Sequence, residues 1–219
     1  VFIFPETDIT ISNFQLKEGW SQQIYDMLPC ENYVRQLDID KGIHTVLYSV
    51  NGISHLRESF ISYPDKVMVI RNIGSEISLI VERGIFLESL RRLDESTLCM
   101  EGQSGADGVR YCFCLRAIKG SLGIIGKTLK CSADSVIIAS AEADFYCGEP
   151  LKAVLGRLDN GEKLGYEKLR KKHIEDISEI MSRCTLKIDC SDNDDIPTDI
   201  RLEAAKSGKA DLGLVNLSF

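Results

Sequence analysis

The amino-acid sequence predicts a mainly β protein, in which a large two-sheet antiparallel β-sandwich precedes an α-helical linker. Short alternating apolar runs, separated by turn residues, fill the chain up to about Phe145. The pair Asn51-Gly52 marks a tight hairpin, because both residues tolerate the positive φ of a type I′ turn. After Cys147 the apolar residues take a helical spacing, which indicates a separate helical part.

The strands are assigned from apolar runs that lie between turn signals. Residues 33–39 form the first strand, and the turn at 40–42 leads into the strand 44–50. The hairpin turn at 51–52 then joins it to the strand 53–62. Further strands are expected at 67–71, 77–82, 98–102, 109–117, 128–132 and 136–143. Strands of this length and spacing are typical of a sandwich.

Two helices are expected directly after the strands. The first spans residues 150–158 and the second spans 162–183. Along the second helix, apolar side chains recur at a spacing of about 3.6 residues and form one stripe. The stripe consists of Tyr166, Leu169, His173, Ile177, Ile180, Met181 and Cys184. A histidine on such a stripe is by default a packed, hydrogen-bonded core residue.

The last part of the chain combines a short strand, an acidic loop and a third helix. Residues 185–188 read as strand, and 189–195 form the acidic loop. The sequence Pro-Thr-Asp at 197–199 begins the helix, with Thr198 as its cap, and Gly208 closes it. The acidic loop lacks the glycine and glutamate that an EF-type calcium loop places at its sixth and twelfth positions. We interpret it as a solvated linker.

Charge and hydropathy exclude two classes of partner. The chain has 26 basic and 33 acidic side chains and a net charge of -7, which repels a polyanion. No apolar run approaches the roughly 20 residues that a membrane-spanning helix requires. We therefore expect neither nucleic acid nor a membrane as a partner.

The cysteines favour buried thiols over a metal site. They are Cys30, Cys99, Cys112, Cys114, Cys131, Cys147, Cys184 and Cys190. No CxxC pair occurs, whereas zinc ligands usually come in closely spaced pairs. We expect no metal and no cofactor, and a reducing, cytoplasmic compartment. Secretion stays open, because residues 1–5 begin without methionine and read like the middle of a strand, so the true N-terminus is expected to be absent.

Two further motifs do not support a chemical function. Residues 126–128 match the end of a phosphate-binding P-loop, but Ser121 stands where the motif requires glycine. The residues after 128 also read as strand, so a hairpin is the better interpretation. Glu142 and Asp144 would stand side by side on one strand, whereas glycoside hydrolysis needs carboxylates across a substrate.

One segment near the start of the chain carries a longer pattern. Residues 33–38 read Tyr-Val-Arg-Gln-Leu-Asp and precede the hairpin. Arg-Glu-Ser-Phe at 57–60 and Pro-Asp-Lys-Val at 64–67 follow it. Such short matches are weak by themselves, and their order along the chain is what matters.

Two later segments continue this pattern. Residues 165–176 contain a Tyr, a Leu and a His-x-x-Asp, and Arg-Cys-Thr-Leu follows at 183–186. Residues 196–202 read Ile-Pro-Thr-Asp-Ile-Arg-Leu, and Leu-Ser-Phe ends the chain at 217–219. Together and in this order, the segments resemble the N-terminal half of the glycoside hydrolase family 95 α-L-fucosidases.

The resemblance implies a super-sandwich at 1–147 and a helical linker at 148–219, which leads to an (α/α) barrel in the complete protein. In this family the general acid Glu, and the Asn and Asp that activate water for inversion, belong to the barrel. No catalytic residue is therefore assigned here. The expected function is that of a non-catalytic N-terminal domain, inactive alone, whose parent hydrolyses terminal α-L-fucosyl or related L-sugar linkages.

The resemblance also implies structural roles in the linker, which would fix the barrel against the sandwich. The candidates are Tyr166, His173, Asp176, Pro197, Asp199 and Arg201. Arg201 is expected to pair with Asp199 or Asp176. The expected partners are the barrel of the same polypeptide and, through the parent enzyme, a carbohydrate. Self-association is a further expectation, because surface normally covered by the barrel would be exposed.

A stand-alone carbohydrate-binding β-sandwich module is the alternative function. Such a module stacks exposed aromatic residues on sugar rings. The single Trp20 and an aromatic content of 7% do not favour it.

Overall fold

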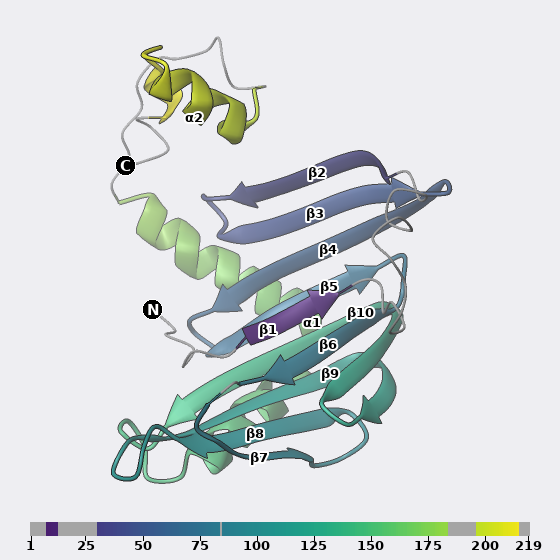
Figure 1. Ribbon diagram of the computed structural model, residues 1–219, viewed down its shortest axis with the longest axis vertical. Helices are drawn as coiled ribbons and strands as arrows, with labels where there is room; N and C mark the ends of the chain where they lie inside the picture. The colour runs from purple at the N-terminus through teal and green to yellow at the C-terminus, as the bar shows by residue number, and fades with distance from the viewer. Residues whose placement is uncertain (1–7, 13–29, 84, 184–195, 215–219) are drawn as a thin grey trace. The chain divides into compact units, whose positions relative to one another are not determined.

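The computed structural model describes residues 8–12, 30–83, 85–183 and 196–214 (Figure 1). The elements in these residues are β1 (Asp8–Ser12), β2 (Cys30–Asp38), β3 (Ile43–Val50), β4 (Ile53–Ser62), β5 (Val67–Ile73), β6 (Ile77–Glu82), β7 (Leu87–Arg92), β8 (Thr97–Gln103), β9 (Arg110–Ile125), β10 (Thr128–Ala143), α1 (Pro150–Met181) and α2 (Thr198–Lys206). The chain forms two compact units, residues 1–176 and 177–219. Each unit is described by itself.

The first unit is built on one antiparallel sheet with the order β2-β3-β4-β5-β10-β9-β8-β7. Strand β10 shifts register between Cys131 and Val136. Its residues 128–131 pair with β6, and its residues 134–139 pair with β5. Strand β6 also pairs with β1, and Figure 1 shows these two strands as a second layer in front of the sheet. The predicted fold class, an antiparallel β-sandwich followed by a helical segment, is confirmed.

Two apolar cores lie on the opposite faces of the sheet, because successive side chains of a strand point to opposite sides. In β10, Ile137 and Ala139 belong to the core that is shared with β6, whereas Val136 and Ile138 belong to the core that is shared with α1. The second core is completed by Val154, Leu158 and Leu169 of α1. A strand that is covered on both faces reads as a continuous apolar run, as residues 136–139 do.

Helix α1 runs across the sheet on the face opposite β1 and β6 (Figure 1). Where two helices were expected, with a break near 159–161, one helix continues to a kink at Gly165, which has φ 72° and ψ 168°. Gly161 does not break the helix. It brings the helix close to the sheet, since a Cβ there would lie 3.1 Å from the Cδ1 atom of Ile138. No helix in the described residues is long and apolar enough to span a membrane.

The predicted hairpins are confirmed. Asn51 and Gly52 have φ of 51° and 74°, as a type I′ turn requires. Gly126, with φ 57°, lies in the two-residue turn that joins Ile125 of β9 to Thr128 of β10, so the P-loop-like segment is a hairpin. Strand β7 was not predicted, because its sequence LESLRR is rich in charge.

The second unit contains α2. Pro197 stands at the N-cap with φ −53° and ψ 140°, and no side chain caps the helix. The expected cap by Thr198 is therefore corrected, because Thr198 already lies inside the helix. Gly208, with φ 91°, follows the C-cap Ser207, as predicted. The strand expected at 185–188 and the acidic loop at 189–195 lie outside the described residues, as do Trp20, Cys184 and Cys190.

Candidate functional site at the sheet–helix joint

Polar side chains fasten α1 to the sheet at several points along the helix. We call these contacts the sheet–helix joint. They connect Arg157 with Glu142, Arg116 with Asp159 and Glu162, Tyr166 and Arg170 with Glu58, and Lys172 with Asp65. The helix is thus held by directional contacts as well as by its apolar face.

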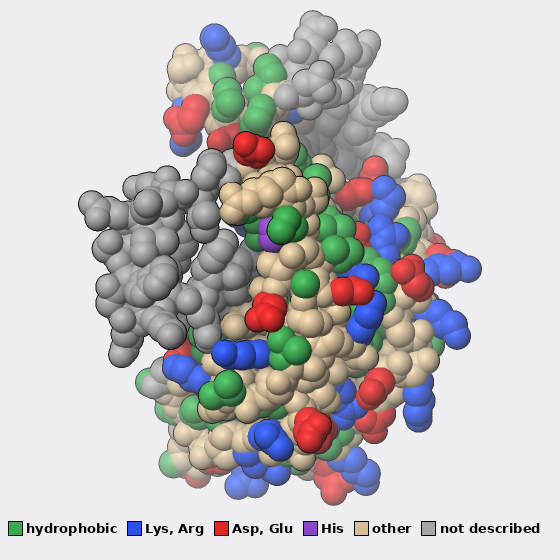
Figure 2. Space-filling model, turned by 90° about the vertical axis from the view of Figure 1, so that its right-hand side faces the viewer, with side chains coloured by type: hydrophobic (Ala, Val, Ile, Leu, Met, Phe, Trp, Pro, Cys, Tyr) green, Lys and Arg blue, Asp and Glu red, His purple; other side chains and the backbone are tan. Residues whose placement is uncertain are grey.

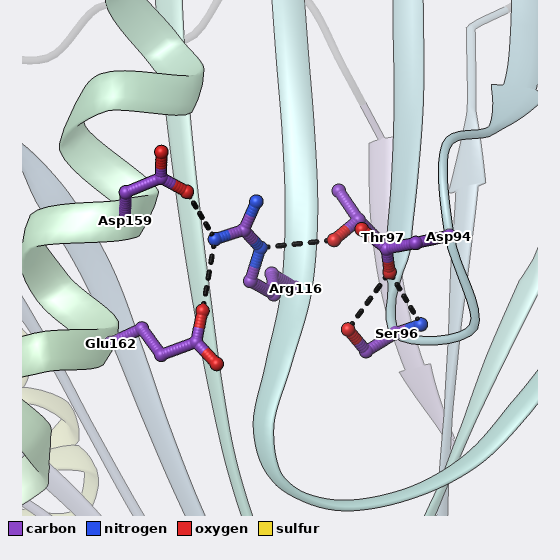
Figure 3. Close-up of polar contacts among 6 residues, drawn as sticks. All are labelled: Asp94, Ser96, Thr97, Arg116, Asp159 and Glu162. Carbon is purple, nitrogen blue, oxygen red and sulfur yellow. Dashed lines mark hydrogen bonds and ion pairs between the residues drawn. The ribbon is translucent and has the colours of Figure 1, made fainter.

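Arg116 of β9 forms the first part of the joint (Figure 3). Its Nη1 donates to Asp159 at 2.7 Å and to Glu162 at 3.0 Å, and its Nε donates to the hydroxyl of Thr97 at 2.9 Å. Burial alone would lower the pKa of Arg116, but the two carboxylates outweigh it and raise that pKa. Both carboxylates are more than half exposed, so solvent screens the attraction. The contact therefore orients the helix more than it stabilises the fold.

Glu58 of β4 forms the second part of the joint. Its carboxylate accepts a hydrogen bond from the phenol of Tyr166 and two from Arg170, at 2.8 and 3.3 Å. Burial, and then the hydrogen bond to this carboxylate, raise the pKa of Tyr166. The Tyr166 ring also lies 6.3 Å from the ring of Phe60, between centroids. Since the Glu58 side chain is only 13% exposed, this contact is the better shielded one.

His173 and Lys172 complete the joint one turn further along α1. His173 is 2% exposed, and its ring stacks on Phe60 with centroids 4.8 Å apart. Its Nε2 lies 3.1 Å from the carbonyl oxygen of Gly42, so Nε2 is the nitrogen that carries the proton. Lys172 contacts the buried carboxylate of Asp65, which also accepts a hydrogen bond from Ser62 at 3.0 Å.

The other predicted site residues take no part in the contacts of the sheet–helix joint described above. Asp176 is half-buried on α1, Pro197 stands before α2, and Asp199 is exposed in the first turn of α2. Arg201 forms a bidentate ion pair with Asp211, at 2.8 and 2.6 Å. Within the second unit, the expected pairing with Asp199 is therefore corrected, whereas the pairing with Asp176, a residue of the first unit, stays a prediction. Positions two apart on a helix do not face each other, whereas the turn after α2 brings Asp211 back to Arg201.

Glu58 and Asp65 were not predicted as site residues, although a signal for them existed. They belong to the Arg-Glu-Ser-Phe and Pro-Asp-Lys-Val segments that the sequence analysis singled out. In the structure these segments contact the segment that contains Tyr166, Lys172 and His173. Two of the segments that carry the family resemblance therefore meet in space.

A pocket of about 790 Å³ lies beside the start of α1, and several carboxylates line it. Three of them are engaged with bases: Glu101 with Arg91, Glu149 with Lys152 and Asp159 with Arg116. A glycosidase acid needs a raised carboxyl pKa. In the described residues, the carboxyl groups with a displaced pKa are all lowered: Asp38, Asp94, Asp134, Glu142 and Asp211.

Two family models match different parts of the chain. Residues 13–148 match the family model described as glycosyl hydrolase family 65, N-terminal domain. Residues 165–219 match the model described as glycosyl hydrolase family 95 catalytic domain. The family 95 likeness is thus found in the C-terminal part of the chain, whereas the β-domain matches family 65. No curated protein is significantly similar in sequence.

One similar solved structure is that of a protein assigned as a kojibiose phosphorylase, from the human microbiome. The TM-score is 0.56, and the sequences are 11% identical. The match covers 78% of this chain and 27% of that protein. At this identity the likeness concerns the fold alone, and the present chain spans about a quarter of that protein's length.

Proposed function

Since the chain belongs to the family of glycosyl hydrolase family 65 N-terminal domains, we propose that it is the non-catalytic β-domain and linker of a larger glycoside-active enzyme. Its role is to hold the catalytic barrel of the same polypeptide in place. The family match covers more than half of the chain, and the match to a catalytic domain begins only at residue 165.

The observation that carries this proposal is the contact of Glu58 with Tyr166 and Arg170. Glu58 lies in the region that matches the family 65 domain, and its two partners lie in the region that matches the family 95 catalytic domain. A mostly buried carboxylate with a phenol and a guanidinium as donors is a directional contact. It supports a linker whose first residues are held on the β-domain.

We assign the parent enzyme to the α-L-fucosidase-like hydrolases, with terminal α-L-fucosyl or related L-sugar linkages as substrates and inversion at the anomeric carbon. The family 95 match at 165–219 and the pattern of motifs support this assignment. The match to a catalytic domain begins only at residue 165, which supports an inactive isolated chain. Lys and Arg side chains alternate with Asp and Glu over the face shown in Figure 2, which does not favour a polyanion as a partner.

One observation favours the alternative of a carbohydrate-binding module. Phe145 and Tyr146 are 76% and 78% exposed, and their rings meet edge to face with centroids 5.0 Å apart. Exposed aromatic rings of this kind can stack on sugars. Titration of the chain with fucosylated oligosaccharides tests this alternative, with Tyr146→Ala as the matched variant.

The main proposal is tested by assaying the isolated chain and the complete polypeptide on 4-nitrophenyl α-L-fucoside. We expect turnover by the complete polypeptide alone, with β-L-fucose as the first product. Turnover by the isolated chain would refute the non-catalytic role. Phosphate-dependent cleavage of an α-glucoside by the complete polypeptide, with no action on fucosides, would replace the hydrolase assignment with a phosphorylase.

A further inference from the structure

Three cysteine side chains meet in the core between the sheet and α1. Cys99 of β8 and Cys114 of β9 are directly opposite in the register, and Cys112 lies two residues before Cys114 on the same face. The Sγ atoms of Cys99 and Cys112 are 3.7 Å apart, as are those of Cys112 and Cys114. All three lie within 4.8 Å of one another. Each residue is at most 1% exposed.

This arrangement could not be predicted from sequence spacing, because Cys99 lies 13 residues from Cys112 and on another strand. Antiparallel pairing brings the three side chains together on one face of the sheet. Cys131 faces the other core, which is shared with β6. It therefore provides a matched buried thiol outside the cluster.

The ligand set narrows the class of ion. Thiolates are soft ligands that select Cu(I), zinc or iron–sulfur clusters. A structural zinc site and an iron–sulfur cluster each need four protein ligands. In the described part of the chain, no His, Asp, Glu or further Cys joins the three thiols. A zinc site with water as the fourth ligand would need a water molecule beside the three sulfur atoms, where each cysteine is at most 1% exposed. Cu(I) accepts three sulfur ligands in a plane and needs no fourth ligand.

The distances fit such an ion without rearrangement of the strands. A metal at the centre of three sulfur atoms, with metal–sulfur bonds of about 2.3 Å, holds these atoms about 4 Å apart. Two of the three Sγ–Sγ distances are 3.7 Å, and all three sulfur atoms lie within 4.8 Å of one another, so the spacing is close to this value.

Protonation also affects the affinity of such a site. A cation that binds the three sulfur atoms displaces their thiol protons to solvent, so its affinity depends on pH.

The cluster adjoins the pocket beside the start of α1. Cys112 lines the pocket beside the start of α1, together with Leu151 and Leu155 of the helix. Glu88, Glu101, Glu149 and Asp159 line the same pocket together with Arg110 and Lys152, so acidic side chains outnumber basic ones in the lining. Such a mouth attracts cations rather than anions.

We propose that Cys99, Cys112 and Cys114 form a trithiolate site for a soft monovalent metal ion, with Cu(I) as its chemical representative. The ion joins β8 and β9 beneath α1 and binds without any change of oxidation state. This site is independent of the function proposed above for the domain.

The test is an anaerobic titration of the reduced chain with Cu(I) in competition with bathocuproine disulfonate. We expect one tightly held ion per chain. Cys114→Ser should weaken Cu(I) binding by more than the roughly 10- to 100-fold that loss of an outer partner costs. Cys131→Ser should leave the affinity unchanged. Equal binding by both variants, or no binding by the unchanged chain, would overturn the proposal.

X-ray absorption of the unchanged chain with Cu(I) keeps the test valid if Cys114→Ser fails to fold. Three sulfur neighbours support the site, whereas two sulfur neighbours or a mixed nitrogen and sulfur shell contradict it. In a parallel titration, zinc should bind the chain more weakly than Cu(I) does. A four-coordinate zinc complex that Cu(I) cannot displace would show that Cu(I) is the wrong ion. Binding of Cu(I) should strengthen as the pH rises, because protons leave the thiols.

Discussion

Glu58 and Tyr166, which are 108 residues apart in the chain, are joined by a hydrogen bond between β4 and α1. Arg170 donates to the same carboxylate from one helical turn further on. This relationship ties the sheet to the helix at one mostly buried charge. The effect expected for Glu58→Gln depends on it.

Glu58→Gln should destabilise the chain. The neutral amide cannot balance the positive charge of Arg170, which now donates its hydrogen bonds to a carboxylate. We expect a loss of about 1 to 3 kcal/mol in the free energy of unfolding, measured by urea denaturation. Glu167→Gln changes an exposed residue on the same helix and is the control. It should stay within about 0.5 kcal/mol of the original chain. Equal effects of the two changes would show that the Glu58 contact contributes nothing.

Gly165→Ala should also destabilise the chain. Gly165 has φ 72° and ψ 168°, a backbone conformation that is essentially restricted to glycine and costs an L-residue about 1 to 3 kcal/mol, although a Cβ there would meet nothing within 4 Å. Gly156→Ala is the matched control in the same helix, where a Cβ is equally free of contacts. This change should stabilise the helix by up to about 1 kcal/mol. Thermal unfolding measures the melting temperature of both variants, which should fall for Gly165→Ala and rise for Gly156→Ala. A higher melting temperature for Gly165→Ala would refute the kink.

Leu158→Ala should have the largest effect of these changes. Leu158 is fully buried between α1 and the sheet, and its truncation leaves a cavity. We expect a loss of about 2 to 5 kcal/mol in the free energy of unfolding. Ile180→Ala, at a position 55% exposed, should cost little. A small effect at Leu158 in urea denaturation would mean that α1 does not cover the sheet in solution.

Asp211 should titrate near pH 2. The hydrogen bonds from Arg201 lower its pKa from 3.8 to about 2. A carboxyl whose folded-state pKa is lowered contributes stability above its unfolded pKa and loses it as the pH falls. The Arg201–Asp211 contact should therefore hold above about pH 3.8 and be lost on descent through about pH 2.

Carbon-13 NMR of the Asp211 carboxyl measures this titration directly. Arg201→Ala should return the pKa towards 3.8, whereas Glu203→Gln, on the exposed side of α2, should leave it lowered. An unchanged pKa in Arg201→Ala would exclude the ion pair. In the complete enzyme, an Arg201→Ala variant with unchanged melting temperature and activity would remove Arg201 from the structural set.

Local chemistry made part of the fold predictable. The turn at Asn51-Gly52 depends on the backbone freedom of two adjacent residues, so the β3–β4 hairpin was correctly predicted. The break in α1 was misplaced, because a glycine in a helix can end it or bring it close to a neighbour. Gly161 has the second role, and only the position of Ile138 in the sheet distinguishes the two.

The sequence by itself determined the antiparallel β class, the change to helix after Cys147 and the segments that mark a glycoside hydrolase domain. Periodicity and turn residues act over a few positions, so they can be read along the chain. Only the tertiary structure decided that Glu58 meets Tyr166, that Arg201 meets Asp211 and that three cysteines share one site. These contacts depend on strand register and on the path of the helix, which local patterns do not encode.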